Sequence, residues 1–418
     1  MSTLRAVEIC AGAGGQAIGL HRAGFAHELA IELDANAAAT LRMNTDWPVA
    51  EGDVADPSVW DPSAYQGIDL LAGGVPCPPF SIAGKQLGSA DERDLFAWAV
   101  EQVGVVKPRA LLLENVRGLA SSRFAAYRQR VLDRLAEFGY VADWRLLHAA
   151  DFGVAQLRPR FVLVAMAPED AAYFEWPTPA TERVTVGAAL RDLMAANGWP
   201  YADEWAAMAD GVGPTLVGGS KKHGGADLGP TRAKRAWADL YVDGKGVADD
   251  APGPDAPHPA EKMPRLTVEM VAKLQGWQDS FGWTFSGRKT SQYRQIGNAF
   301  PPPVAEALGL AIARALRHEG STHPVPSLVS TVHDPVYRVL SETTDFVTAD
   351  DLLHLLRGQR NPGSKLDQQL KVLENDFHLD SRTVKGILSY RLGEFRGFVG
   401  QDDHQRHAFL TSNRSKVS

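Results

Sequence analysis

The chain has 418 residues, of which 44% are hydrophobic and 22% charged, and its formal net charge is −7. This composition is typical of a globular protein with more than one domain, and the two cysteines, which lack zinc-ligand spacing, exclude a disulfide framework. The first residues contain no signal-peptide hydrophobic stretch, and no apolar run is long enough to cross a bilayer. We therefore expect a cytoplasmic protein with no membrane partner and no metal.

Short apolar runs alternate with helical patterns through the first 165 residues. The expected strands are Ala6–Cys10, His27–Ile31, Ile68–Ala72, Ala110–Leu113 and Arg160–Ala165. The expected helices are Gln16–Ala23, Ala35–Asn44, Phe96–Val106 and Ser122–Phe138. This alternation predicts an α/β fold with a doubly wound, mainly parallel sheet, and the near-continuous apolar strands fit burial on both faces.

In the remainder of the chain, the composition changes after residue 167 and helical patterns return after residue 262. Residues 168–262 are rich in Gly, Pro, Trp and Ala, and helical patterns return at Leu266–Leu274 and Pro301–Leu316. After a linker at 321–326, three more helices are predicted at Thr348–Leu356, Lys365–Asn375 and Ser381–Arg391. We expect a domain at 1–167 that the helix 299–318 completes, a smaller domain at 168–290, and a small helical C-terminal extension at 327–418.

A glycine-rich turn, Glu8-Ile9-Cys10-Ala11-Gly12-Ala13-Gly14-Gly15, joins the first strand to the first helix. Glycines let the backbone approach a ligand, and a helix N-terminus favours electron-rich groups. Glu32 ends the second strand and Asp53 follows the third, where carboxylates accept hydrogen bonds from a ribose and from an adenine amino group. A glycine turn alone fits a structural turn equally well, but the two acidic strand ends favour a nucleoside cofactor.

One cysteine stands between prolines in Gly73-Gly74-Val75-Pro76-Cys77-Pro78-Pro79-Phe80-Ser81, directly after a predicted strand. A thiol held at a strand end is a candidate nucleophile, because the thiolate is strongly nucleophilic. The alternative is a buried structural cysteine in a proline-rich turn.

Three further motifs carry polar side chains. Leu113-Glu114-Asn115-Val116 ends the next strand at the same sheet edge as Cys77, and Gln156-Leu157-Arg158-Pro159-Arg160 opens another strand with two arginines on one side. Gln295-Ile296-Gly297-Asn298-Ala299-Phe300-Pro301 predicts a tight turn into the last long helix. Taken alone, Glu114 also suits a helix N-terminus and the arginines a solvated edge.

Together and in this order, the five motifs resemble those of the DNA cytosine-5 methyltransferases of bacterial restriction-modification systems. The resemblance covers about residues 4–317 and includes the segment from Arg265 to Trp277. It implies the S-adenosylmethionine-dependent methyltransferase fold, with residues 168–290 as a target-recognition domain and double-stranded DNA as the substrate.

The resemblance also implies the chemistry. The thiolate of Cys77 adds to carbon 6 of a cytosine flipped out of the duplex, so that carbon 5 can accept the methyl group of S-adenosylmethionine. Glu114 then hydrogen-bonds ring nitrogen N3 and the amino group, and Arg160 contacts the carbonyl oxygen. Asn115 helps to position this site, and Arg158 lies near the backbone or the nucleophile.

The cofactor residues carry over from the same motifs. They are Ile9, Cys10, Gly12, Gly14, Gly15, Glu32, Leu33, Asp53, Val54, Pro76, Asn298 and Ala299. The sequence departs from the family at three positions: Cys10 replaces a frequent Phe that stacks on adenine, Glu8 a frequent Asp, and Pro78 a frequent Gln. The missing aromatic leaves the strength of cofactor stacking open. We expect no disulfide between Cys10 and Cys77, since a bridge would block the nucleophile.

The candidates for DNA contact lie in two segments, the part matching the family's mobile loop at 80–95 and the predicted recognition domain. They are Ser81, Lys85, Arg93, Lys221, Lys222, Arg232, Lys234 and Arg235. Positive charge gathers in the second segment against a negative total, and the place of this segment in the resemblance implies DNA contact, where Arg and Lys can read guanine in the major groove. A solvated surface is the alternative for both groups.

We expect a monomer that acts alongside a cognate restriction endonuclease. Three other hypotheses stay open: an RNA cytosine-5 methyltransferase, a non-catalytic DNA-binding regulator, and a nicotinamide dehydrogenase suggested by the glycine turn alone. The long region 168–262 favours duplex DNA over RNA, and intact Cys77, Glu114 and Arg160 count against the other two. The extension after residue 326 lies outside the resemblance, and a DNA-contacting, a domain-packing or a dimerising role fits it.

Overall fold

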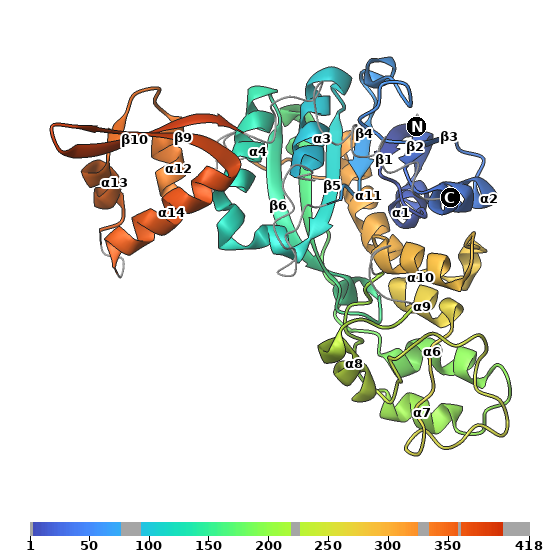
Figure 1. Cartoon of the computed structure of the whole chain (residues 1–418). Coiled ribbons are helices and arrows are strands. Elements are labelled where there is room, and N and C mark those ends of the chain that lie inside the picture. Colours follow the sequence, from blue (N-terminus) through green and yellow to red (C-terminus); the bar gives the residue numbers. More distant parts are fainter. Residues whose placement is uncertain (1–2, 77–92, 219–225, 325–333, 358–360, 396–418) are drawn as a thin grey trace. The chain divides into compact units, whose positions relative to one another are not determined.

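The computed structural model describes residues 3–76, 93–218, 226–324, 334–357 and 361–395 (Figure 1). The chain divides into two compact units. The first comprises Met1–Gly74, Pro108–Glu114 and Trp144–Pro324. The second comprises Val75–Lys107, Asn115–Asp143 and Val325–Ser418, so two helices of the predicted catalytic domain group with the C-terminal extension.

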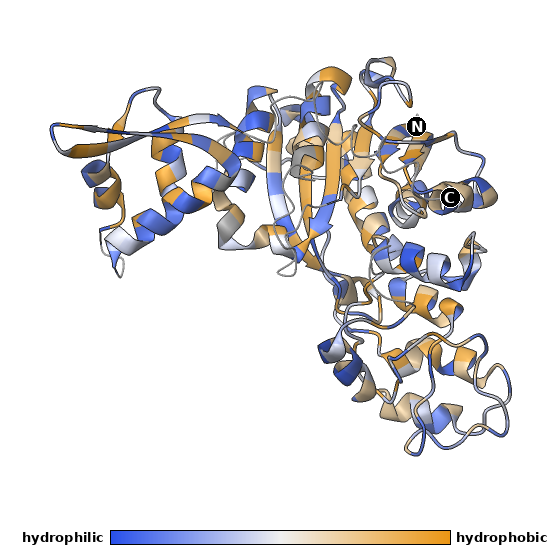
Figure 2. Ribbon diagram, viewed as in Figure 1, coloured by the Kyte–Doolittle hydropathy of each residue, from blue (hydrophilic) through white to orange (hydrophobic). Residues whose placement is uncertain are grey.

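A seven-stranded sheet with the order β3-β2-β1-β4-β5-β7-β6 forms the centre of the first unit. Its strands are β1 (Leu4–Ile9), β2 (Phe25–Glu32), β3 (Val49–Glu51), β4 (Leu70–Gly73), β5 (Ala110–Val116), β6 (Val141–His148) and β7 (Pro159–Met166). Strand β1 pairs in parallel with β2 and β4, β2 with β3, and β4 with β5. The predicted doubly wound, mainly parallel sheet is therefore confirmed, and its strands are largely apolar (Figure 2).

Strand β7 runs opposite to β5. Arg160 near the start of β7 meets Glu114 near the end of β5, and the Ala167 amide just after β7 donates to the Arg109 carbonyl just before β5. This reversal matters for function, because it brings the beginning of β7 to the same sheet edge as the carboxyl ends of β1, β4 and β5.

Helices α1 (Gly15–Arg22), α2 (Ala35–Asn44) and α11 (Pro302–Leu316) belong to the first unit. The Asp34 side chain caps α2 by accepting from the amides of Asn36 and Ala37, and prolines open α11, where a missing N–H has no consequence. Helix α1 packs closely on α11 at Gly19. The positions predicted for these three helices are confirmed to within one residue.

Residues 168–298 are more helical than the weak sequence periodicity indicated. They form α5 (Pro168–Ala171), α6 (Val186–Ala195), α7 (Ala202–Met208), α8 (Thr231–Ala238), α9 (Val268–Gln275) and α10 (Lys289–Asn298). A core that includes the fully buried Trp205 and Trp237 holds the helices from α6 to α10 together, and it extends to Ile296 on α10, whereas Ala171 of α5 packs on the core of the sheet. Thr267 caps α9.

The expected tight turn at 295–301 is only partly correct. Gln295 to Asn298 form the last turn of α10, and the chain turns afterwards at Ala299–Pro301. The apolar side of α10 is short and interrupted by polar residues, so the sequence pattern did not reveal this helix.

The second unit contains α3 (Arg93–Val106), α4 (Ala125–Glu137) and the C-terminal extension with α12 (Pro335–Ser341), β8 (Val347–Thr348), α13 (Ala349–Leu355), α14 (Pro362–Asp376), β9 (Phe377–Val384) and β10 (Ile387–Phe395). Short 3-10 helices in the chain are η1 (Pro62–Tyr65), η2 (Arg117–Ala120), η3 (Ser122–Phe124), η4 (Ala149–Phe152) and η5 (Asp279–Phe281).

The predicted helix Ser381–Arg391, and with it a purely helical extension, is wrong. These residues form two strands of a three-stranded sheet with the order β8-β10-β9. Lys385 and Gly386 both have positive φ, 52° and 78°, as a two-residue hairpin loop requires. The β-branched residues before this loop fit a strand better than a helix, and the Lys-Gly pair marks the reversal that the helical interpretation overlooked.

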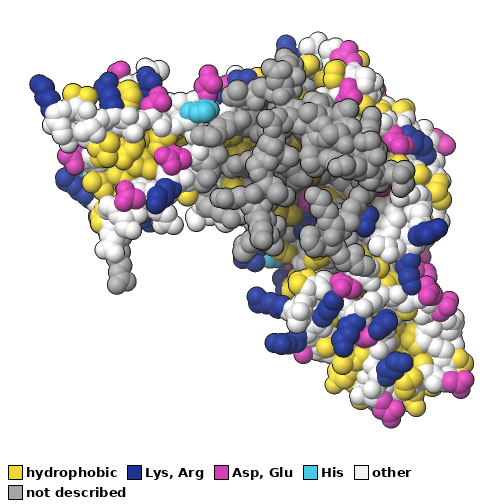
Figure 3. Space-filling model, viewed as in Figure 1, with side chains coloured by type: hydrophobic (Ala, Val, Ile, Leu, Met, Phe, Trp, Pro, Cys, Tyr) yellow, Lys and Arg dark blue, Asp and Glu magenta, His cyan; other side chains and the backbone are white. Residues whose placement is uncertain are grey.

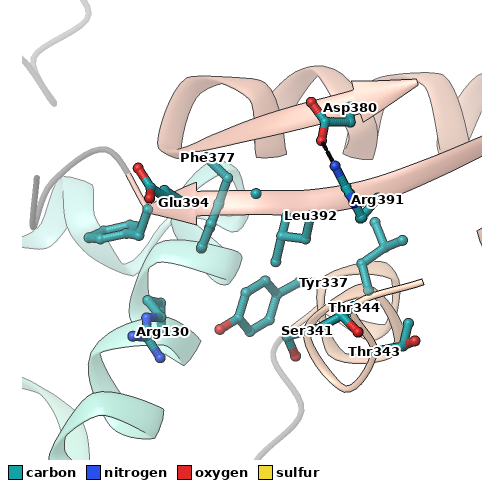
Figure 4. Close-up of a pocket in the computed structure, with 13 residues that line it drawn as sticks. Arg130, Tyr337, Ser341, Thr343, Thr344, Phe377, Asp380, Arg391, Leu392 and Glu394 are labelled. Atoms are coloured by element: carbon teal, nitrogen blue, oxygen red, sulfur yellow. Dashed lines mark hydrogen bonds and ion pairs between the residues drawn. The ribbon is translucent and has the colours of Figure 1, made fainter. Parts of the chain in front are cut away.

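The extension packs on α4 within the second unit. Tyr337 of α12 donates its hydroxyl hydrogen to the Asp133 carboxylate at 3.0 Å, and Tyr127 and Phe395 place their ring centres 5.6 Å apart. Beside these contacts lies a pocket of about 450 Å³ whose lining includes Arg130 of α4 and Leu392 of the hairpin (Figure 4). These contacts favour the domain-packing role for the extension.

Among the described residues, no helix is both long and apolar enough to cross a membrane. No group of three or more His, Cys, Asp and Glu side chains among them has an arrangement that would hold a metal ion.

Gly19→Ala tests the close packing of α1 on α11. The added Cβ would lie 2.5 Å from the Pro302 carbonyl oxygen and 2.6 Å from the Ala305 Cβ, so the helices must separate. We expect the free energy of unfolding to fall by about 1–3 kcal/mol, measured by urea denaturation. Gly253→Ala is the control, because its Cβ meets nothing within 4 Å. Equal losses in the two variants would contradict the interpretation.

Candidate active site

The glycine-rich turn after β1 has an unusual backbone. Cys10, Gly12 and Gly14 adopt positive φ angles of 52°, 58° and 90°, and Gly14 caps α1. Glycine takes this conformation at little cost, whereas Cys10 is a non-glycine residue in the left-handed region. A Cβ on Gly12 would meet no atom within 4 Å, so open space faces the turn there.

Glu32 at the end of β2 fixes the shape of this turn. Its Oε2 accepts from the Gly12 amide and its Oε1 from the Asp34 amide, both at 2.7 Å. Burial raises the pKa of Glu32, while the hydrogen bonds from the backbone amides oppose that shift. The neighbouring Leu33 is exposed. The predicted acidic strand end is therefore in contact with the predicted glycine turn.

The third strand end carries the other predicted acid. Asp53 is largely buried, and its Oδ1 accepts from the Ala55 amide at 3.0 Å. The carbonyl of the buried Val54 accepts from the Trp60 indole N–H at 2.7 Å, which holds this segment in place. Carboxylates thus stand at the ends of two adjacent strands.

The last motif lies directly against the first. A Cβ on Gly15 would stand 2.3 Å from the Phe300 carbonyl oxygen and 3.0 Å from the Ala299 Cβ. The exposed Asn298 follows on α10, and its Oδ1 would be 2.3 Å from a Cβ on Gly218. The structure therefore brings the cofactor candidates from both ends of the first unit together, with Ile9 buried beneath them as the last residue of β1.

These features fit a nucleoside cofactor. Two buried carboxylates supply hydrogen-bond acceptors, and the open space beside Gly12 lets a ligand approach the backbone.

Glu114 and Arg160 form a largely buried ion pair, with 2.6 Å between Glu114 Oε1 and Arg160 Nε. Burial lowers the pKa of Arg160, and the negative charge of Glu114 opposes that shift. A Cβ on Gly74 would lie 3.4 Å from Glu114 Oε2 and 3.8 Å from the Cys10 carbonyl oxygen. The carboxylate is thus fixed by a cation at the sheet edge where β1, β4 and β5 end.

Asn115 belongs to the second unit together with the segment that begins at Val75. Its Nδ2 lies 3.5 Å from the Val75 carbonyl oxygen, and its Oδ1 accepts from the Val116 amide at 2.7 Å. The next residue, Pro76, is exposed. The predicted nucleophile Cys77 lies outside the described residues.

Arg158 has a role that its motif did not reveal. The side chain is completely buried and lies just before β7. Its guanidinium donates to the carbonyls of Leu216, Gly297 and Ala299 at 2.7 to 2.9 Å. Burial lowers its pKa, and the charge of Arg160 adds to that shift. Arg158 therefore joins three backbone segments.

Two buried glutamines extend this junction. Gln156 accepts from the Leu216 amide at 2.8 Å and donates to the Gln275 Oε1 at 2.8 Å. Gln275 in turn donates to the Ala299 carbonyl at 2.6 Å. Gln156 stands inside a motif, yet the sequence assigned it no part, because its partners Leu216 and Gln275 are 60 and 119 residues away in the chain.

The DNA-contact candidates separate into three groups. Ser81, Lys85, Lys221 and Lys222 lie outside the described residues, as does the side chain of Arg93, whose backbone begins α3. Lys234 pairs with Asp227 at 2.7 Å. Arg232 and Arg235 are exposed three residues apart on α8, in a region where Lys and Arg side chains gather (Figure 3).

Trp283 is a contact of the glycine turn that the sequence did not suggest. Its indole N–H donates to the Ala13 carbonyl at 3.1 Å, across 270 residues of chain. No motif surrounds it, and aromatic residues between two helices most often fill a core.

Comparison with known proteins agrees with this geometry. The family model for "C-5 cytosine-specific DNA methylase" matches residues 4–314. The chain is 58% identical to "Type II methyltransferase M.NaeI" of Lentzea aerocolonigenes over 422 residues, covering all of both chains. It is 49% identical to "Type II methyltransferase M.NgoMIV" of Neisseria gonorrhoeae over 318 residues, which cover 75% of this chain and 98% of that protein.

Solved structures share the fold. A putative DNA modification methyltransferase encoded within an E. coli prophage superposes with a TM-score of 0.52 at 21% identity, covering 75% of this chain and 99% of that one. The Spodoptera frugiperda DNMT2 mutant has the same TM-score at 15% identity, covering 74% and 99%.

Arg158→Lys tests the buried junction. A lysine keeps the charge but lacks the planar fork that reaches several carbonyls, so acceptors are left without partners. We expect the free energy of unfolding to fall by about 2–4 kcal/mol in urea denaturation. Arg183→Lys is the matched control, because Arg183 is exposed and, among the described residues, pairs with Asp151. We expect its free energy of unfolding to change by less than about 0.5 kcal/mol. An Arg158→Lys variant with the same free energy of unfolding as the wild type would contradict the stabilising role of this junction.

Proposed function

The chain belongs to the family of C-5 cytosine-specific DNA methylases, and from that premise we propose that it methylates cytosine within a specific duplex sequence through a covalent adduct of Cys77. The observation that carries the proposal is the buried Glu114–Arg160 pair at the edge of the sheet. A fixed carboxylate beside a guanidinium matches the donors and acceptors along one edge of cytosine.

The proposed reaction begins with a flipped cytosine, since carbon 6 is inaccessible inside the stack. The Cys77 thiolate forms a bond to carbon 6, and the electron pair of the 5,6 double bond becomes available at carbon 5. Carbon 5 would then take the methyl group as the bond between that methyl group and the donor's sulfonium sulfur breaks, so that the donor leaves as a neutral thioether. Loss of the carbon 5 proton and cleavage of the carbon–sulfur bond restore the aromatic ring and the free thiol.

Glu114 and Arg160 have complementary parts in this proposal. Glu114 hydrogen-bonds N3 and the amino group, which stabilises the electron density that moves into the ring as sulfur adds. Arg160 holds the carboxylate in one orientation through its Nε contact, and it contacts the carbonyl oxygen of the base. Asn115 orients the segment that leads to the nucleophile.

S-adenosylmethionine supplies an electrophilic methyl group on a sulfonium centre. Glu32 and Asp53 suit the ribose hydroxyls and the adenine amino group, as their positions at adjacent strand ends support. The glycine turn, Val54, Pro76, Asn298 and Ala299 complete the proposed site. The positive charge of the sulfonium also favours a site with buried carboxylates.

The biological setting is proposed from the relatives. Proteins named as Type II methyltransferases match the chain at high identity, which supports a role in protecting DNA from a cognate endonuclease. The region 168–290 is proposed to read the sequence, with Arg232 and Arg235 on α8 facing the duplex. Residues 327–418 lie beyond the part matched by the family model, residues 4–314, which supports a role outside the shared chemistry.

Cys77→Ser tests the covalent step. We expect loss of methyl transfer to duplex DNA by at least a thousandfold, with the Kd for S-adenosylmethionine changed less than about threefold, because the thiol is the nucleophile. DNA containing 5-fluorocytosine should trap the wild-type chain as a denaturant-stable complex, since fluorine cannot leave carbon 5 as a proton does. The variant should form no such complex.

Cys10→Ser is the control for that experiment, because it removes the other cysteine of the chain. It should still form the covalent complex. Full transfer by Cys77→Ser would reject the mechanism, and bisulfite sequencing of DNA from expressing cells would report both the modified base and its sequence context.

The double variant Arg232→Ala/Arg235→Ala tests the recognition surface. Removing two phosphate-binding cations should raise the Kd for duplex DNA and reduce the slope of log Kd against log salt by about 2. The Kd for S-adenosylmethionine should stay constant. Lys262→Ala removes an exposed cation of the same region that does not belong to α8, and it should leave the slope unchanged. An unchanged slope in the double variant would exclude α8 from the DNA surface.

A further inference from the structure

We infer that Trp283 is a positioning residue for the cofactor, which together with Glu32 holds the glycine turn in its binding conformation. This inference deepens the proposed function and rests on it for the identity of the ligand. Its structural basis is a set of contacts within the first unit.

The turn needs external support. Three of the five residues from Cys10 to Gly14 have positive φ, and Cys10 does so without the freedom of glycine. A backbone of this kind persists only where its surroundings determine it. Within the turn, the Gly14 amide donates to the Ala11 carbonyl, and Glu32 holds the Gly12 amide.

Trp283 supplies a second hold on the turn. Its indole N–H donates to the Ala13 carbonyl at 3.1 Å. A Cβ on Gly14 would stand 2.6 Å from Trp283 Cζ2 and 2.9 Å from Leu41 Cδ2, so the indole ring packs directly on the glycine backbone. The ring also packs on a small cluster formed by Ala11, Ala30 and Leu41.

The segment that carries Trp283 is itself fixed on α2. The Asn44 side chain donates to the Thr284 carbonyl at 2.7 Å and accepts from the Thr284 amide at 2.8 Å. The Ser286 amide donates to Thr40 Oγ1 at 2.9 Å. The indole therefore approaches the turn from a rigid platform, and little freedom is lost when it bonds to Ala13.

The contact bears on the departure at Cys10. A chain without an aromatic residue in its first motif has less stacking surface for adenine, so its affinity depends more on a preformed backbone. A preformed turn binds more tightly because the ligand need not order it. Trp283 and Glu32 each hold the turn through a hydrogen bond to its backbone.

Trp283→Phe is the decisive variant, because it keeps an aromatic ring and removes the N–H donor. We expect the Kd for S-adenosylmethionine, measured by calorimetry, to rise about fivefold, the factor that one neutral hydrogen bond commonly contributes. At saturating S-adenosylmethionine, kcat and the Kd for DNA should stay within twofold. Hydrogen exchange of the amides at residues 10–16 in the ligand-free chain should become faster.

Trp199→Phe is the matched control. Trp199 donates its indole N–H to the Ala256 carbonyl at 3.2 Å in the same unit, away from the turn. It should alter neither the Kd for S-adenosylmethionine nor exchange at residues 10–16. Equal effects of both variants on the Kd, or wild-type values for Trp283→Phe, would overturn the inference. If the wild-type chain bound no S-adenosylmethionine, the proposed function would fail, while the exchange experiment would still decide whether Trp283 orders the turn.

Discussion

The buried guanidinium of Arg158 is the constraint on which the first unit depends. Removing a charge from water is expensive, and the group is retained only because the carbonyls of Leu216, Gly297 and Ala299 replace its hydration. These carbonyls belong to the segment that ends at residue 218, to α10 and to the turn after it. One side chain just before β7 thus joins this segment and the end of α10 to the central sheet.

The two arginines of the motif around β7's first residue have different partners and therefore different roles. Arg158 and Arg160 are both buried and two residues apart, yet Arg158 bonds to backbone carbonyls while Arg160 meets the carboxylate of Glu114. A carboxylate that is paired with a cation keeps one orientation, and an oriented carboxylate is what recognition of a base edge requires. The structural role of Arg158 and the proposed catalytic role of Arg160 therefore belong to side chains two residues apart.

Sequence analysis predicted the parts of the fold that local patterns encode. The strands β1, β2, β4, β5 and β7 were recognisable because each is a short apolar run next to a helical pattern. Glu32 and Glu114 could be chosen because each stands at the end of such a strand. The β9–β10 hairpin was missed because its Lys385-Gly386 loop is short and β9 is largely polar.

The remaining contacts of the site arise only in three dimensions. Trp283 meets Ala13 across 270 residues, and the Gln156–Gln275 bond spans 119. Neither contact leaves a periodic or compositional trace, because each partner is determined by the packing of distant elements.

Three contacts make the glycine turn after β1 dependent on the end of the first unit. Gly15 packs on Ala299 and Phe300, α1 packs on α11, and Trp283 holds Ala13. The turn's positive φ angles are unfavourable for Cys10 without this support. The glycine turn after β1 therefore depends for its conformation on contacts made by residues 283–316, at the other end of the first unit.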